Sequence, residues 1–188
     1  MENKESIIRQ EVGVKGIVRM QLRDKDGNIK KLFQGNGIWE FLHKNLNLDL
    51  RVSGITGSWT EQEVVYNTIT NAGLALIAKR LGGVTANAIT HMAIGEGTPT
   101  ATALQSEITT GGGERDAVTP ASATTTVTDD TIRCTNTFTF SDTFTITEEG
   151  LFNAASNGTM AASRSFSAIN VSSGDSLQIT HDVVMTAV

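Results

Sequence analysis

The chain of 188 residues has only one cysteine, Cys134, so no disulfide can form within it. We expect Cys134 to be a small core residue and the chain to be made in a reducing compartment. No stretch approaches the roughly 18 apolar residues of a membrane span. The first residues are polar and charged, and they lack the apolar segment of a signal peptide. The sequence therefore predicts neither a membrane protein nor one exported by a classical route.

Basic residues are scarce after the first part of the chain. Residues 51–188 hold six Lys or Arg against thirteen Asp or Glu, and no lysine follows Lys79. Residues 1–50 hold nine basic and seven acidic residues. A nucleic-acid-binding protein needs a basic stripe, often with aromatic residues between the charges, and aromatic residues make up only 5% of this chain. The sequence therefore disfavours nucleic acid as a partner and predicts two regions with different surroundings.

Motifs that carry chemistry are lacking as well. His43, His91 and His181 have no zinc-ligand spacing, although the last two lie in strand-like stretches and could meet in space. The chain has no serine-nucleophile elbow and no phosphate loop. The adjacent Glu148 and Glu149 would point to opposite faces of a strand, so a solvated turn is their expected setting. We therefore expect no catalysis, no bound metal and no cofactor.

Threonine is abundant instead: it occurs 26 times, always after residue 50. Its β-branched, half-polar side chain suits a pleated, half-buried surface. Alternating stretches predict strands at 16–24, 29–33, 89–94, 124–127, 132–140, 143–147, 160–168 and 176–185, with a break at 149–150 and a tight turn at 157–158. The inward-facing residues should share one core: Ile132, Phe138, Phe140, Phe144, Ile146 and Leu177. The pattern predicts a mainly β fold, an antiparallel and jelly-roll-like β-sandwich.

Two segments have helical periodicity. Residues 71–81 predict a helix with Asn71 as the N-cap, which would pack on the sandwich through Leu74, Ile77 and Leu81. Residues 38–50 predict a short helix that Asn36 could cap, with Trp39 in the core. The organisation we expect is an arm, a hairpin and a short helix in residues 1–50, a linker loop in 51–69, and a helix with the sandwich in 70–188.

The hairpin at residues 16–33 is a candidate interface. Its turn, Asp24 to Asn28, superficially resembles a calcium loop, but its glycine is wrongly spaced for an EF-hand. Its apolar face, Val18, Met20 and Leu22, must be covered by the main domain or by a neighbouring subunit. The polar arm before it, residues 1–12, has too few apolar residues to fold alone. We expect residues 1–35 to supply part of a contact between subunits.

Trp59 lies in a loop rich in Gly, Ser and Thr, beside Glu61 and Glu63. A tryptophan in such a loop either packs on its own domain or anchors a partner. The candidate interface residues are therefore Val18, Met20, Leu22 and Trp59.

Several segments occur in an order that is more specific than any one of them: 70–78 (TNAGLALIA), 91–97 (HMAIGEG), 144–155 (FTITEEGLFNAA), 158–161 (GTMA) and 173–179 (SGDSLQI). In these segments the chain resembles tailed-bacteriophage virion proteins that are described as tail- or fibre-associated structural proteins. The likeness covers about two-thirds of the chain, residues 70–188. It implies a compact β-sandwich in an assembled particle, with no catalysis and no active-site residues.

The resemblance implies a particular setting for the protein. It would be a homo-oligomer that is made in the host bacterial cytoplasm and incorporated into the virion. Its partners would be copies of itself and the major capsid or tail proteins. Two positions stay open, a capsid decoration (cement) protein and a tail, baseplate or fibre-attachment protein. From another class, a module that binds host-surface carbohydrate is the alternative.

Overall fold

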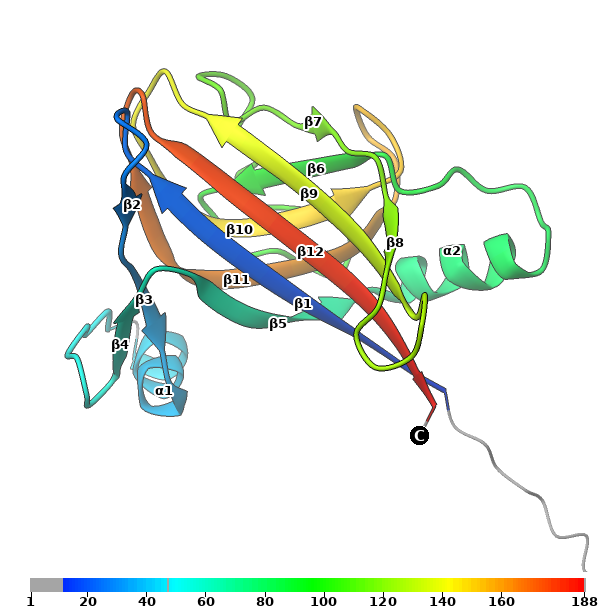
Figure 1. The fold of residues 1–188 in the computed structure, drawn as a ribbon, viewed down its shortest axis with the longest axis horizontal. Coiled ribbons are helices and arrows are strands. Elements are labelled where there is room, and N and C mark those ends of the chain that lie inside the picture. Colours follow the sequence, from blue (N-terminus) through cyan, green and yellow to red (C-terminus); the bar gives the residue numbers. More distant parts are fainter. Residues whose placement is uncertain (1–11, 47, 188) are drawn as a thin grey trace, which may run out of the picture.

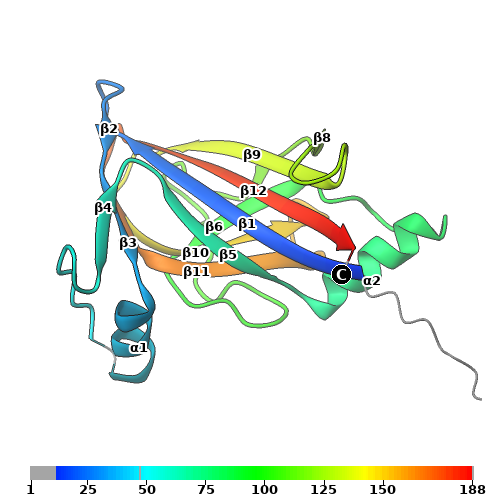
Figure 2. The same cartoon turned by 60° about the horizontal axis from the view of Figure 1, so that its bottom comes forward.

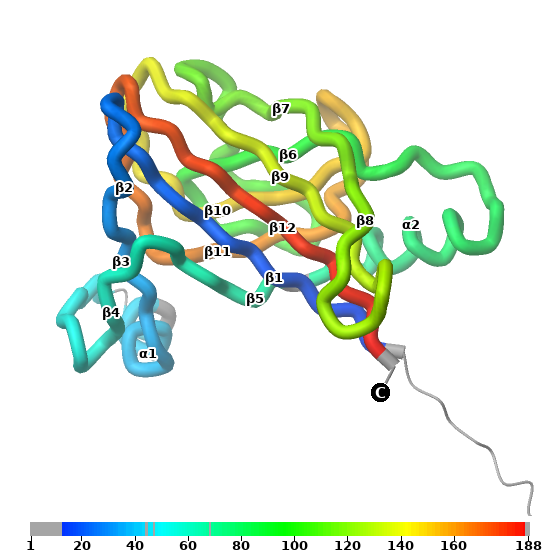
Figure 3. The backbone as a smooth tube through the Cα atoms, in the orientation of Figure 1, coloured from blue at the N-terminus to red at the C-terminus, as the bar shows by residue number. Residues whose placement is uncertain are grey.

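The first and last strands of the protein lie side by side in a computed structural model that describes residues 12–46 and 48–187. Strand β1 (Val12–Arg23) pairs with β12 (Ser176–Ala187) through twelve consecutive antiparallel residue pairs. The tube view shows the start of β1 beside the end of β12 (Figure 3). The strand expected at residues 16–24 is confirmed, but it begins earlier. Residues 1–11 of the expected arm lie outside the described residues.

Neighbouring strands extend this pair into a ten-stranded antiparallel sheet. The strand order is β7, β6, β10, β11, β5, β1, β12, β9, β8, with β2 beside β1. The further strands of this sheet are β2 (Ile29–Lys30), β5 (Glu63–Ile69), β6 (His91–Gly95), β7 (Asp116–Ala117), β8 (Ala121–Ala123), β9 (Thr131–Thr139), β10 (Phe144–Phe152) and β11 (Met160–Val171). The expectation of a mainly β, antiparallel fold is therefore confirmed.

The sheet doubles over at β5. Residues 63–67 of this strand pair with β1, and residues 68–69 pair with β11. As a result β8, β9, β12 and β1 form one layer, and β6, β10 and β11 form the other (Figures 1 and 2). The main core fills the space between them with apolar side chains from both layers.

The six core residues expected from the sequence do lie in this core. Four of them are buried, namely Phe138, Phe140, Ile146 and Leu177, while Ile132 and Phe144 pack against the cluster from its margin. Cys134 is also fully buried there, and burial raises the pKa of its thiol to about 12. It is the small core residue that its sequence setting predicted.

Side-chain hydrogen bonds explain two of the turns. The Asp24 carboxylate accepts the backbone N–H groups of Asp26 and Asn28, so the hairpin turn closes on itself as expected. At residues 124–127 the predicted strand is wrong. The Asp130 carboxylate accepts the backbone N–H groups of residues 125, 126 and 127, and this holds the segment in a turn after the short β8.

Of the two features expected in residues 149–158, a break and a tight turn, only the turn is present. Strand β10 runs without interruption through Glu149 and Gly150, so the predicted break there is wrong. The turn between β10 and β11 is confirmed: Asn157 and Gly158 have φ values of 53° and 74°. Two successive positive φ angles suit the tight turn of a hairpin, and Asn-Gly adopts them readily.

A small unit projects from one end of the sheet. It consists of β3 (Leu32–Gly35), α1 (Gly37–Leu46) and β4 (Gly57–Thr60), with β3 and β4 paired in a separate two-stranded sheet (Figures 1 and 2). The short helix is confirmed, although it ends at Leu46 and residues 48–50 lie outside it, and the Asn36 side chain caps it by accepting the N–H groups of Ile38 and Trp39. We call residues 32–60 the projecting unit.

The second helix, α2 (Asn71–Leu81), lies at the opposite end of the molecule (Figure 1). Its bounds are as expected, but Thr70 rather than Asn71 caps it, by accepting the N–H of Gly73. The expected packing face is confirmed at Ile77, which is half-buried and packs against the main core, but it is wrong at Leu74 and Leu81, which are 44% and 88% exposed. The buried positions are Gly73 and Leu76, so the helix docks through a glycine that lies against the Ala161 backbone.

The expected division of the chain also requires correction. Residues 51–69, predicted to be a linker loop, contain β4 and β5, and β5 is the strand at which the sheet doubles over. Residues 1–50 contribute β1, which lies between β5 and β12 inside the main sheet. The sheet therefore requires residues from both sides of the predicted boundary.

Replacing Gly73 with Ala tests the corrected face of α2. Alanine is favoured over glycine inside a helix by up to ~1 kcal/mol, so helix propensity alone predicts stabilisation. A Cβ at this position would collide with the Ala161 carbonyl, and we expect Gly73→Ala to lower the free energy of unfolding by ~1–3 kcal/mol in urea denaturation. Leu81→Ala should stay within ~0.5 kcal/mol of the wild type. If Leu81→Ala were more destabilising than Gly73→Ala, the helix would pack through its leucines, as the sequence predicted.

Candidate functional site

The apolar face of the hairpin is covered by the protein itself. Val18 and Met20 are fully buried, and Leu22 is 2% exposed, all three in the main core. They are on β1, which lies between β5 and β12 in the sheet, and their side chains pack in the main core of the same chain. The expectation that these three residues contact a partner is therefore wrong for this fold.

Trp59 is placed differently from these three. It lies on β4 and is 49% exposed, with the edge of its ring directed at Phe33, 5.5 Å between centroids. Phe33 is buried, so the indole ring of Trp59 packs against the protein on one side and is exposed to solvent on the other. Both roles considered for Trp59, packing and partner contact, are compatible with this position.

Exposed apolar side chains gather on the projecting unit and the loop within it. Of the thirteen large hydrophobic side chains that are exposed among the described residues, seven lie between residues 38 and 59. We call these seven the apolar surface: Ile38, Phe41, Leu46, Leu48, Leu50, Ile55 and Trp59. The sequence did not identify it, because a helical stripe looks the same whether it faces a core or solvent. The available signal was the small size of the unit, which cannot bury so many apolar residues by itself.

The opposite side of α1 faces the body. Trp39 is 6% exposed, as its predicted packing role requires, and its ring stacks on His43 at 4.6 Å and 11°. Its indole N–H donates to the Asp49 carboxylate. Burial alone would raise the pKa of Asp49, but hydrogen bonds from Arg51 and Trp39 outweigh this and hold the pKa below its usual value. The indole ring is therefore fixed from two directions.

A cleft of about 680 Å³ lies between this side of α1 and the main sheet. Trp39, Glu40 and His43 line the helical wall, and residues 164–167 of β11 line the sheet wall. Glu63 on β5 and Glu96 in the turn after β6 complete the set of carboxylates around it. We refer to this space as the cleft.

Glu63 is the unusual group of the cleft. It is 1% exposed, and its Oε2 has no hydrogen-bond partner among the described residues. Burial raises the pKa of Glu63 to about 8, although Arg51, Arg164 and hydrogen bonding with Ser167 act in the opposite direction. A large part of the Glu63 population therefore carries a proton at neutral pH.

The other charges of the cleft are only partly paired. A guanidinium nitrogen of Arg164 lies 3.6 Å from a carboxylate oxygen of Glu40, beyond hydrogen-bond distance, and the buried Nε of Arg164 has no partner among the described residues. Glu96 accepts the backbone N–H of Thr145 at 2.6 Å. With Glu63 protonated, the negative charges of Glu40 and Glu96 exceed the single positive charge of Arg164, so the cleft favours cations over anions.

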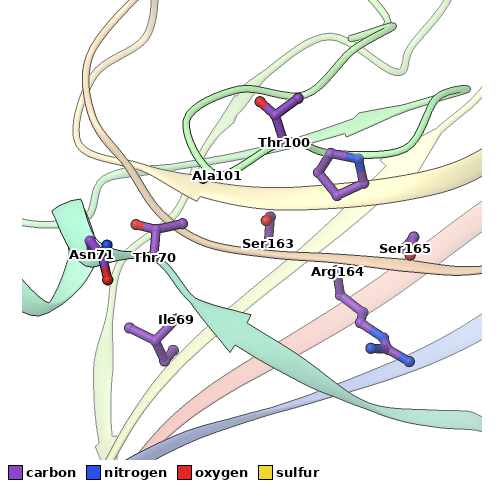
Figure 4. Close-up of a pocket in the computed structure, with 9 residues that line it drawn as sticks. Ile69, Thr70, Asn71, Thr100, Ala101, Ser163, Arg164 and Ser165 are labelled. Atoms are coloured by element: carbon purple, nitrogen blue, oxygen red, sulfur yellow. The ribbon is translucent and has the colours of Figure 1, made fainter.

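A smaller pocket of about 360 Å³ lies where α2 begins (Figure 4). It is lined by Thr70 and Asn71, by Thr100 and Ala101 in a loop, and by part of β11. Figure 4 shows the Arg164 side chain pointing away from Thr100 and Ala101. The helix N-terminus is capped by Thr70, and Arg164 is the one charged residue in the lining of this pocket.

Glu148 and Glu149 are not in a solvated turn; both are fully buried in β10. The Glu148 carboxylate accepts the backbone N–H groups of Gln105 and Ser106 at 2.8–3.2 Å, which fastens the 98–113 loop to the sheet. Glu149 accepts from, or shares a proton with, His181 Nδ1 at 3.0 Å, from the opposite layer. The sequence predicted a solvent-exposed position for Glu148 and Glu149 because their hydrogen-bond partners lie more than thirty residues away in the chain.

His181 is at the centre of a buried polar group. It contacts Glu149 through one ring nitrogen and the Asn67 side chain through the other. Gly16 makes room for Asn67, because a Cβ at Gly16 would occupy the space of that side chain. His91 instead bonds to its neighbour Thr90 and does not join this group. The group is enclosed between the two layers, which suits a role in the packing of the core.

Asp182, next to His181, faces outward and holds three strands together. It is bonded to Arg19 of β1 and Arg133 of β9 at 2.6–2.7 Å. Burial would raise the pKa of Asp182, but the two guanidinium groups outweigh this and hold the pKa below its usual value. The bridge therefore links the three central strands of one layer.

Among residues 12–46 and 48–187, no three His, Cys, Asp or Glu side chains are placed so that they could hold a metal ion. No helix in that part of the chain is long and apolar enough to cross a membrane. Comparison with protein-family profiles, curated proteins and solved structures finds no match to this chain.

Glu63 should give the protein a measurable pH dependence. Its pKa is raised from 4.5 to about 8 in the folded state, so the folded protein binds a proton between these pH values that the unfolded chain has released. Stability should therefore fall as the pH rises through this window and then level off. Glu63→Gln removes this term, so the variant should gain on the wild type from pH 5 to pH 9 by up to a few kcal/mol in urea unfolding. Glu61→Gln, at an exposed position, is the control. A constant difference between Glu63→Gln and the wild type over this range would contradict the assignment.

His181→Ala should be strongly destabilising. It leaves the Glu149 carboxylate buried without its histidine, and breaking a buried pair on one side costs ~3–5 kcal/mol. His91→Ala is the matched control, since His91 is only half-buried, and it should cost ~1 kcal/mol or less. Denaturant unfolding of both variants provides the comparison, and equal losses would show that the buried group has no special weight.

Proposed function

We propose that the protein is a non-enzymatic structural component of a tailed-bacteriophage virion and that it docks on its neighbours through the apolar surface. The order of motifs in residues 70–188 supplies the class of protein. The observation that carries the docking role is the concentration of exposed apolar side chains on the projecting unit. The doubled-over sheet suits the β-sandwich that the resemblance implies, and the jelly-roll-like strand order stays a prediction.

The energetics favour a partner for this surface. Monomeric proteins rarely leave large contiguous apolar areas in water, and such areas commonly mark contact sites. Removing apolar area from water contributes ~25 cal/mol per Å², so side chains such as Phe41 and Ile55 would stabilise a contact once covered. The projecting unit also stands away from the body, so a neighbour can reach it (Figure 2).

The partners we propose are copies of the protein and the major capsid or tail proteins. A decoration protein on the capsid and a tail, baseplate or fibre-attachment protein would use the surface in the same way. Half-exposed Trp59 also keeps the carbohydrate-binding alternative open, because sugars stack on open aromatic rings. A glycan array tests that alternative: binding that Trp59→Ala abolishes and Phe41→Ser leaves intact would favour it over docking.

Incorporation into particles is the direct test of docking. In particles of the phage that encodes the chain, mass spectrometry should find the protein in many copies. The double variant Phe41→Ser/Ile55→Ser, supplied in place of the wild type, should be incorporated at least ~10-fold less, since more than 1.4 kcal/mol of apolar burial is lost. Leu81→Ser is the matched control: it removes an apolar side chain that is 88% exposed on α2, and it should be incorporated normally.

Thermal melting of each variant must show that the fold is intact before incorporation is compared. Particles that lack the protein altogether would contradict the virion assignment. Equal incorporation of the double variant and Leu81→Ser would leave the virion assignment intact, but it would show that the apolar surface is not the docking site.

A further inference from the structure

We infer that the cleft receives a basic side chain, a lysine or an arginine, from the protein on which this chain docks. The inference rests on the proposed docking function and names the chemistry of the partner at that contact. It starts from a cleft whose lining includes three carboxyl groups, one of which, that of Glu63, is almost completely buried and has an unpartnered oxygen.

The charges of the cleft select the sign of the occupant. Glu40, Glu63 and Glu96 come from three different segments of the chain and line one cleft, and Arg164 is the guanidinium in the same lining. Arg164 lies 3.6 Å from Glu40 and keeps a buried Nε without a partner, whereas Arg51, which acts on Glu63 from outside the lining, is paired with Asp49. Neither cation is bonded to Glu63. An acidic or phosphorylated occupant would meet repulsion, whereas a cation would supply the missing opposite charge.

Glu63 supplies the specific contact. Its Oε2 is an acceptor without a donor, and a buried polar group left unpaired costs ~1–3 kcal/mol. This oxygen is buried from solvent, so the carboxyl group must turn towards the cleft before an N–H group of a lysine or guanidinium can satisfy it and stabilise the charged carboxylate. The raised pKa of Glu63 adds a consequence, because an incoming cation should expel the proton that the empty cleft retains.

The walls suit a long aliphatic chain that ends in a charge. Trp39 and His43 form a stacked pair on the helical side, and the bond from Trp39 to Asp49 keeps the indole in place. Lysine and arginine bury their methylene chains against such surfaces, and guanidinium groups stack on aromatic rings. A bare divalent cation would make no use of this wall, and the residues described here include no group of three metal-ligating side chains.

The position of the cleft points to a protein rather than to a free small molecule. Helix α1 presents Trp39, Glu40 and His43 to the cleft and Ile38, Phe41 and Leu46 to solvent. One partner surface can therefore cover apolar residues of α1 and insert a basic side chain beneath the same helix. Interfaces commonly combine an apolar area with a charged residue of this kind.

The test uses the full-length protein and three capped tripeptides, acetyl-Gly-Arg-Gly-amide, the same peptide with neutral citrulline in place of arginine, and acetyl-Gly-Glu-Gly-amide. Backbone and indole NMR signals are followed during titration at low salt. The arginine peptide should shift the signals of Trp39, Gly97 and Ser165 saturably at millimolar concentration. The citrulline and glutamate peptides should bind at least ~10-fold more weakly. Glu63→Gln should weaken arginine-peptide binding at least ~5-fold, and Glu61→Gln should leave it unchanged.

Calorimetry at pH 7 in buffers of different ionisation enthalpy adds a second readout, since arginine-peptide binding should release protons from the wild type and none from Glu63→Gln. Equal binding of the citrulline peptide would show that charge is not recognised. Shifts that Glu63→Gln leaves unchanged, or saturation by CaCl₂ alone at lower concentration, would also overturn the inference. A cleft that binds the arginine peptide in a protein absent from particles would refute the virion assignment alone. Normal incorporation together with no peptide binding would refute the inference alone.

Discussion

The ladder between β1 and β12 is the interaction on which the rest of the fold depends. It joins residue 12 to residue 187 and residue 23 to residue 176, so it closes nearly the whole chain into one loop. Such long-range pairing forms only after a large loss of chain entropy, and folds dominated by it form slowly. Once formed, it places β1 between β12 and β5, and the two layers cannot enclose their core without it. A division of the chain near residue 50 would separate β1 from both of its neighbours, and a division near residue 70 would separate β1 from β12 and β5 from β11.

Local sequence patterns were sufficient for local structure. The hairpin turn at Asp24, the Asn157-Gly158 turn and both helices were predictable because their hydrogen bonds and dihedral preferences lie within a few residues. Strand pairing was not, since alternation in β1 shows that one face is buried but not which chain segment buries it. The interface expected at Val18, Met20 and Leu22 failed for this reason.

Polar residues misled the sequence interpretation where their partners are distant. Glu148 and Glu149 look like surface residues until the amides of 105–106 and the imidazole of His181 are placed beside them. Glu63 differs in that no cationic side chain is bonded to it, and burial raises its pKa to about 8; an unpartnered oxygen is common to Glu63 and Glu149. No spacing in the sequence distinguishes these two situations. Of the candidate site, only the exposure of Trp59 was open to prediction.

The antiparallel pairing of β1 with β12 also determines how the molecule is oriented towards its surroundings. Residues 12 and 187 lie together at one pole, and the projecting unit with its apolar surface lies at the other (Figures 1 and 2). A peptide or protein fused at either of these strand ends would therefore leave from the same point, away from the docking side. Joining the two ends with a short linker would give a circular permutant whose new termini could be opened in any exposed turn. The same geometry suits the protein as a scaffold for display.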